Sequence, residues 1–198
     1  MTIFQLVLLL ASAFFALKVY AHIQTLKDPE ESREDAQPRK IDAFSTFNSE
    51  ELIQKADNAF ENGDADKALS LLNEANEKEA NNPDILFKIA YILQGQSNDD
   101  KALKYYKEAL KLDENNEFIH NALATIYKRN DEFVSARMHL DESLEIDESN
   151  PITYYNYGNL LVKMQKEDEA ILMYEKALEI NPTFDEAVEE IQKLKITK

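Results

Sequence analysis

From residue 48 onward, small and large apolar positions recur every 34 residues without a single insertion. Residues that lie 34 positions apart form a column of equivalent positions. A match in one column is weak evidence, but matches in several columns with the same register predict four copies of one structural unit. The columns are Ala56, Ala90, Ala124 and Gly158; Ala68, Ala102, Ala136 and Ala170; Leu72, Tyr106, Leu140 and Tyr174; and Ala75, Ala109, Ser143 and Ala177.

Within each copy, apolar residues lie three and four positions apart on both sides of a short polar segment. In the second copy Leu86, Ile89 and Leu93 precede the segment GQSNDD, and Tyr106 and Leu110 follow it. These spacings predict two amphipathic helices. Because isolated helices of about 13 residues are marginal in water, the hairpins must stack on one another. The predicted units are 49–82, 83–116, 117–150 and 151–184, followed by a capping helix in 185–198.

The fourth copy resembles a tetratricopeptide repeat. Its matching positions are Tyr154, Tyr157, Gly158, Leu161, Ala170, Tyr174, Ala177 and Pro182. The resemblance implies an all-α fold, a right-handed α-solenoid of four helical hairpins with a capping helix and with a concave groove lined by the first helix of each pair. The chain departs from the family in lacking Trp and in placing His120 where an aromatic residue is usual.

The two adjacent tyrosines of the second copy have different predicted roles. Tyr106 shares its column with Leu72 and Tyr174, so we expect it to pack between neighbouring hairpins. Tyr105 shares its column with the less regular set Leu71, His139 and Met173, and lies at the edge of the apolar stripe.

Residues 1–26 precede the repeats and contain an apolar run long enough to cross a bilayer as a helix. A cleaved signal peptide is the alternative, since Ala11 to Ala13 resembles a cleavage site, but no Lys or Arg precedes the run and apolar residues continue past it. We therefore expect an uncleaved N-terminal transmembrane helix. Residues 27–48, with dense charge and two prolines, are typical of a linker. Lys and Arg follow the run, which by the positive-inside rule places the repeats in the cytoplasm; a periplasmic body is the alternative.

The composition argues against several classes of function. Lys and Arg number 22 against 38 Asp and Glu, so nucleic acid is not an expected partner. The absence of cysteine excludes disulfides and thiolate metal sites, and none of the three glycines has phosphate-loop spacing. His22, His120 and His139 fall at no catalytic or metal-binding spacing and are interpreted as structural or exposed. We predict no enzymatic activity, cofactor, metal or small-molecule substrate.

The face of the first helices that the repeat columns leave unused carries more aromatic side chains than solubility requires. Two interpretations are open: these side chains line a peptide-binding groove, or the superhelix curls enough to bury the rings. The groove candidates are Ile53, Phe60, Phe87, Tyr91, Phe118, Asn121, Lys128, Arg129, Tyr155, Asn159 and Lys163.

The groove candidates predict an orientation for a bound peptide. Its basic part would lie near Asp57 and Asp84, and its acidic part or C-terminal carboxylate near the cluster Lys128, Arg129 and Lys163. The amides of Asn121 and Asn159 are expected to hold the peptide backbone.

The expected function is that of a membrane-tethered scaffold that binds a protein or peptide partner. The alternative is an exported periplasmic factor for envelope assembly. The family's clamp for chaperone C-terminal tails does not carry over, because its polar or basic positions are occupied by Ile53, Asp57, Phe118 and Ala122.

Overall fold

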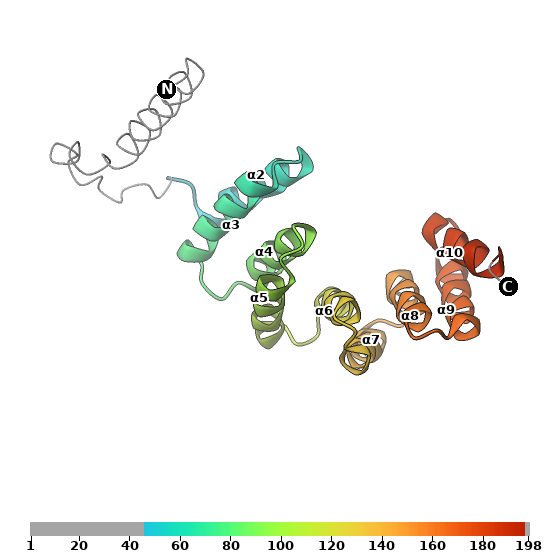
Figure 1. Cartoon of the computed structure of the whole chain (residues 1–198). Coiled ribbons are helices and arrows are strands. Elements are labelled where there is room, and N and C mark those ends of the chain that lie inside the picture. Colours follow the sequence, from blue (N-terminus) through green and yellow to red (C-terminus); the bar gives the residue numbers. More distant parts are fainter. Residues whose placement is uncertain (1–45, 197–198) are drawn as a thin grey trace, which may run out of the picture. The chain divides into compact units, whose positions relative to one another are not determined.

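The computed structural model describes residues 46–196, and these form nine helices and no strand. The helices are α2 (Ser49–Glu61), α3 (Ala65–Lys78), α4 (Pro83–Gly95), α5 (Asp99–Leu112), α6 (Glu117–Arg129), α7 (Phe133–Ile146), α8 (Pro151–Lys163), α9 (Glu167–Ile180) and α10 (Asp185–Ile196). They pair as the hairpins α2/α3, α4/α5, α6/α7 and α8/α9, and α10 packs on α9 (Figure 1). The prediction of an all-α solenoid of stacked helical hairpins with a final extra helix is confirmed.

Asparagine side chains start the first helix of every hairpin. Asn48 forms a capping box with Glu51, in which Oδ1 of Asn48 accepts from the Glu51 N–H at 2.8 Å and the Asn48 N–H donates to Glu51 Oε2 at 3.0 Å. Asn82, Asn116 and Asn150 likewise accept backbone N–H groups of the first turn. These caps satisfy donors that a helix cannot pair internally, so they set where each hairpin begins.

A residue in the left-handed region ends the first helix of every hairpin. These residues are Gly63, Ser97, Asp131 and Gln165, with φ of 79°, 59°, 59° and 59°. Each is followed by a backbone bond that closes the helix end, such as Asp64 N–H to the Ala59 carbonyl at 2.9 Å. The chain therefore reverses in the same way in all four hairpins, although only one of them has glycine there.

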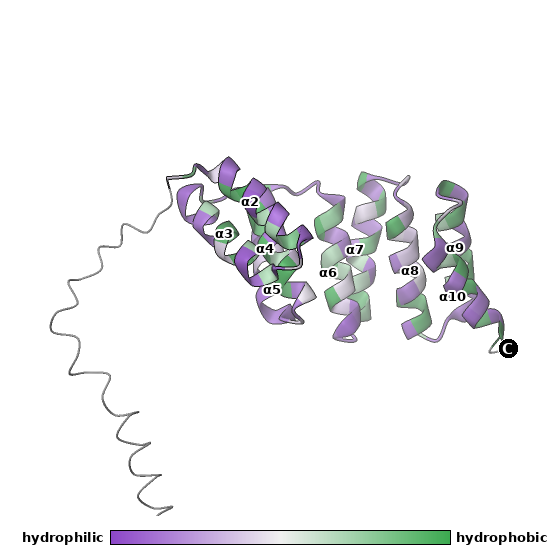
Figure 2. Ribbon diagram, turned by 90° about the horizontal axis from the view of Figure 1, so that it is seen from above, coloured by the Kyte–Doolittle hydropathy of each residue, from purple (hydrophilic) through white to green (hydrophobic). Residues whose placement is uncertain are grey.

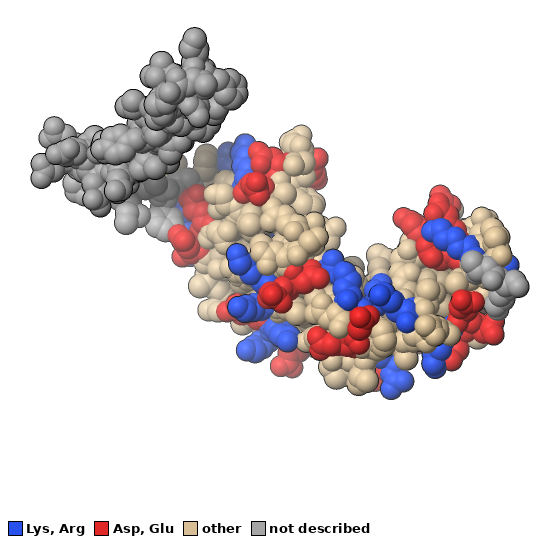
Figure 3. Space-filling model, viewed as in Figure 1, with Lys and Arg blue, Asp and Glu red and all other residues tan. Residues whose placement is uncertain are grey.

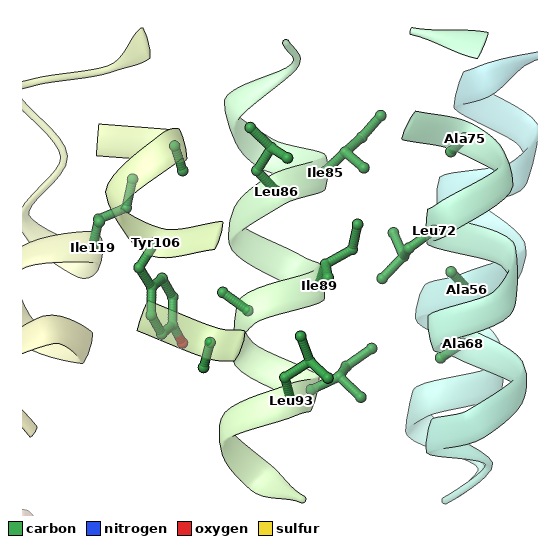
Figure 4. Packing of buried hydrophobic residues seen from close by; sticks show 14 of the residues in the cluster. Ala56, Ala68, Leu72, Ala75, Ile85, Leu86, Ile89, Leu93, Tyr106 and Ile119 are labelled. Carbon is green, nitrogen blue, oxygen red and sulfur yellow. The ribbon is translucent and has the colours of Figure 1, made fainter. Parts of the chain in front are cut away.

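The repeat columns form the core. Ala68, Ala102, Ala136 and Ala170 are fully buried, and so are Tyr106 and Tyr174, which fill the space between helices as predicted. Figure 4 shows Leu72 of α3 pointing toward Ile89 of α4, across the junction between the first two hairpins. Hydrophobic and hydrophilic stretches alternate along each helix, which is the pattern expected of elements buried on one side only (Figure 2).

The predicted transmembrane helix, within residues 1–26, and the predicted linker up to residue 45 lie outside the described residues. Among the helices that are described, none has the length and apolarity needed to cross a bilayer.

Candidate protein-binding surface

The first helices, α2, α4, α6 and α8, carry the eleven groove candidates, and the structure separates them by exposure. Phe60, Tyr91 and Phe118 are exposed, at 41%, 53% and 53% of their surface. Arg129 and Lys163 are also exposed, whereas Ile53, Phe87, Lys128, Tyr155 and Asn159 are half-buried and Asn121 is buried. Neither the open-groove interpretation nor the packing interpretation therefore holds for all of these side chains.

An aromatic pocket of about 210 Å³ lies between α2 and α4. The ring of Phe60 meets that of Tyr91 edge-on at a centroid distance of 5.8 Å, and Phe87 stacks on Tyr91 at 6.3 Å. Ile92 and Leu72 line its floor. Because Phe60 and Tyr91 stay exposed despite these contacts, the pocket presents apolar surface with room for one side chain rather than for a larger ligand.

A salt bridge lies at the edge of this pocket. Lys88 Nζ donates to Asp57 Oδ1 at 2.9 Å, and both side chains line the pocket. The Asp57 carboxylate, which was expected to lie near the basic part of a peptide, therefore already has an ion-pair partner, and a basic peptide side chain would compete with Lys88 for it. Lys88 was not among the predicted groove candidates, and it lies 31 residues from Asp57 along the chain.

Tyr155 is half-buried because aromatic rings cover it on two sides. Its ring centroid lies 5.7 Å from that of Tyr174 and 5.0 Å from that of Phe184. For Tyr155 the packing interpretation describes the structure better than an open groove does.

Asn121 is a correction, because it is buried rather than open to a peptide backbone. Its Nδ2 donates to Ser143 Oγ and to Thr153 Oγ1, each at 2.8 Å, and its Oδ1 accepts from Asn156 Nδ2 at 2.9 Å. Buried polar groups are stable only when paired, and this network pairs them between the third and fourth hairpins. The signal that was missed is Ser143, the one polar residue in a column of alanines.

Basic side chains gather at the C-terminal ends of α6 and α8. Arg129 Nη2 lies 2.7 Å from Asp99 Oδ1, and Lys163 Nζ lies 3.6 Å from Asp131 Oδ1. Burial lowers the pKa of Lys128, and the charges of Arg129 and Lys163 lower it further. Figure 3 shows basic side chains beside acidic ones in the hollow in the middle of this face.

Two tyrosines on second helices form hydrogen bonds with amide side chains of the first helices. The hydroxyl of Tyr106 donates to Gln94 Oε1 and that of Tyr174 donates to Asn159 Oδ1, both at 2.8 Å. Burial raises the pKa of both tyrosines, so both hydroxyls remain donors at every physiological pH. These two tyrosines, which occupy equivalent positions in their repeats, thus orient the amide of Gln94 on α4 and that of Asn159 on α8.

His120 and His139, which looked unrelated in the sequence, form a buried pair with their Nδ1 atoms 3.1 Å apart. The Glu114 carbonyl oxygen lies 3.4 Å from His120 Nε2, and a proton on this nitrogen would leave the Nδ1 of His120 as the acceptor toward His139. The ring of Tyr127 stacks on His139 at 5.4 Å. Within residues 46–196, no cluster of three or more His, Asp or Glu side chains is placed to hold a metal ion.

The sequence matches two models described as tetratricopeptide repeat, one over residues 59–126 and the other over residues 116–183. Together these matches span well over half of the chain. No curated protein matches the chain significantly.

Solved structures of similar fold include several repeat proteins. PilF of Pseudomonas aeruginosa has a TM-score of 0.67 and 22% identity, covering 74% of this chain and 67% of its own. YrrB, described as a TPR protein with an unusual peptide-binding site, has a TM-score of 0.62 and 18% identity, covering 71% and 73%. The first TPR of Spaghetti (RPAP3), bound to an HSP90 peptide, has a TM-score of 0.54 and 24% identity, covering 58% and 91%. At these identities the likeness shows the fold alone.

Proposed function

Because this chain belongs to the tetratricopeptide repeat family, we propose that it is a protein-interaction scaffold that binds an extended peptide segment of a partner along its first helices. The observation that carries the proposal is the aromatic pocket of Phe60, Phe87 and Tyr91. Exposed aromatic rings around a one-residue pocket are what a peptide anchor side chain requires. Two proteins of similar fold, YrrB and the RPAP3 repeat domain, are described as having a peptide-binding site or a bound peptide.

The test is a selection of random extended peptides on the full-length protein in detergent, followed by affinity measurements. Tyr91→Ala removes an exposed ring and should weaken the selected peptides by about tenfold, the loss of one anchor contact. Met138→Ala is the matched control, since Met138 is 51% exposed but lies on the second helix α7. Equal losses in the two variants, or no selectable peptide, would contradict a pocket-based binding mode.

We further propose that residues 1–26 tether the repeats to a membrane, with the repeats in the cytoplasm. Support comes from the apolar run and from the Lys and Arg that follow it. The tether would restrict the partners of the aromatic pocket to proteins that also reach the membrane.

The alternative is a periplasmic body that acts in envelope assembly. Protease treatment of intact, right-side-out vesicles separates the two, because a cytoplasmic body stays protected until the membrane is permeabilised. Digestion in intact vesicles would establish the periplasmic alternative, and release of the protein by carbonate washing would contradict the tether.

A further inference from the structure

Lys128 is a half-buried cation without an anion. It lies in the last turn of α6, and its ammonium has neither an ion pair nor a hydrogen bond among residues 46–196. Withdrawing a charge from water without pairing it costs free energy, and proteins normally compensate such charges. In a chain with a formal net charge of −16, carboxylates that would do this are abundant, yet in the described part of the chain none forms an ion pair with Lys128.

The neighbouring charges make the imbalance larger. Arg129 and Lys163 lie close enough to act electrostatically on Lys128, and each has one carboxylate partner, Asp99 and Asp131. Three cations therefore share two carboxylates. The bridge of Lys163 to Asp131 is long at 3.6 Å and exposed on both sides, so it is weak and easily exchanged for another anion.

Asn159 adds an oriented neutral donor. It precedes Lys163 by one turn of α8, so the two side chains lie on the same side of the helix. The hydroxyl of Tyr174 occupies Oδ1 of Asn159, which leaves the Nδ2 group to donate, and this group has no acceptor among the described residues. The amide that was expected to hold a peptide backbone is thus fixed as a donor.

We propose that Lys128, Asn159 and Lys163 form a subsite for an oxyanion, a carboxylate or phosphate group carried by the peptide that binds the aromatic pocket. This inference rests on the proposed peptide-binding function and names the chemistry of the partner. An oxyanion would accept charge-assisted hydrogen bonds from both ammonium groups and a third bond from the amide.

The spacing of the helices relates this subsite to the aromatic pocket. The pocket lies between α2 and α4, the first helices of hairpins one and two. The subsite lies between α6 and α8, the first helices of hairpins three and four, and so is two hairpins further along the stack. With neighbouring helices about 10 Å apart, the separation is roughly 20 Å, or about six residues of extended chain. The partner segment would therefore carry an apolar side chain and an acidic or phosphorylated group about six residues apart.

The test measures oxyanion binding without any peptide. Full-length protein with ¹³C-labelled lysine side chains is titrated by NMR with inorganic phosphate and, separately, with succinate, against sodium chloride at matched ionic strength. The expected result is a saturable change at the ε-CH₂ groups of Lys128 and Lys163, with a rise in the pKa of Lys128; the Lys163 signal also reports binding in variants that lack Lys128. A response to phosphate alone assigns the subsite to phosphate groups, and a response to succinate assigns it to carboxylates.

Two variants locate the response. Lys128→Met keeps the apolar stem and should weaken binding by roughly tenfold, the loss of one charged hydrogen bond. Lys104→Met, which removes an exposed cation on the second helix α5, should leave it unchanged. Responses no larger than those to chloride, or equal in Lys128→Met, would overturn the subsite. The peptide selection with Tyr91→Ala is a separate measurement, so failure of the subsite and failure of the groove can be told apart.

Discussion

The ring of Tyr174 lies against the backbone of Gly158, so that a Cβ atom at residue 158 would come within 2.6 Å of Cδ1 of the ring. The other copies carry alanine in this column, and the second copy combines Ala90 with an equally buried Tyr106. The two tyrosines take different paths. Tyr106 reaches Gln94, one turn past Ala90, whereas Tyr174 reaches Asn159, the residue next to Gly158.

Gly158→Ala should therefore lower the free energy of unfolding by about 1–2 kcal/mol, despite the better helix propensity of alanine. The ring is fully buried, so it can relieve this contact only if its neighbours shift or its hydroxyl gives up Asn159. Chemical denaturation measures the loss.

The double variant Gly158→Ala/Val162→Gln provides the control, because it copies the Ala90 and Gln94 arrangement of the second copy. It should recover part of the lost stability by giving the Tyr174 hydroxyl an acceptor one turn further along. If the single variant is as stable as the natural protein, the proposed clash is absent.

Tyr106→Ala should cost about 3 kcal/mol, because a fully buried ring is removed from the junction between hairpins. Tyr105→Ala is the matched comparison and should cost less than half as much, since Tyr105 is only half-buried. Denaturant titration of both variants checks the difference. Similar losses would show that the adjacent tyrosines are equivalent, contrary to the structure.

Gln165→Gly should stabilise the protein by about 0.5–1 kcal/mol. Gln165 has φ of 59°, where a Cβ atom is unfavourable and glycine is not, and the gain exceeds the extra entropy that glycine loses on folding. Gly63→Ala tests the same relation in reverse at φ of 79° and should cost about 1 kcal/mol, although nothing lies within 4 Å of the added methyl group. Thermal unfolding of both variants should shift the midpoint in opposite directions.

The histidine pair predicts a loss of stability in mild acid. Burial, with smaller contributions from the neighbouring His120 and Lys107, lowers the pKa of His139 from 6.5 to about 4. Between these two values the unfolded chain binds a proton that the folded protein does not. Stability contributed by neutral His139 is therefore complete above pH 6.5 and is lost as the pH falls toward 4, by about 2 kcal/mol.

A double variant, His120→Tyr/His139→Met, isolates this contribution by installing the residues of the fourth copy, Tyr154 and Met173. Denaturation midpoints at pH 7 and pH 5 should differ less in the variant than in the natural protein. Carboxylates titrate in both proteins, so only the difference between them reports on the histidines. An unchanged pH dependence would contradict the assignment.

The helical framework could be predicted because its signals are local and repeated four times. Columns such as that of Ala68 specify a close helix crossing in every copy, and asparagine at each hairpin start supplies a cap within three residues of sequence. The candidate site was predicted less well. Phe60 and Tyr91 are exposed as expected, but Asn121 is buried and Asp57 is paired with Lys88.

The period of 34, the helices and the small and large residues that meet in the core follow from the amino-acid order alone, since one helix face repeats its contacts from copy to copy. Which polar and aromatic side chains remain available depends on the packing of the hairpins. Asp57, Asn121 and Asn159 form hydrogen bonds with residues that lie 31, 22 and 15 positions further along the chain. The packing of the helices brings these partners together. Such contacts depend on the geometry with which helices pack, and the local pattern of apolar and polar residues does not predict that geometry.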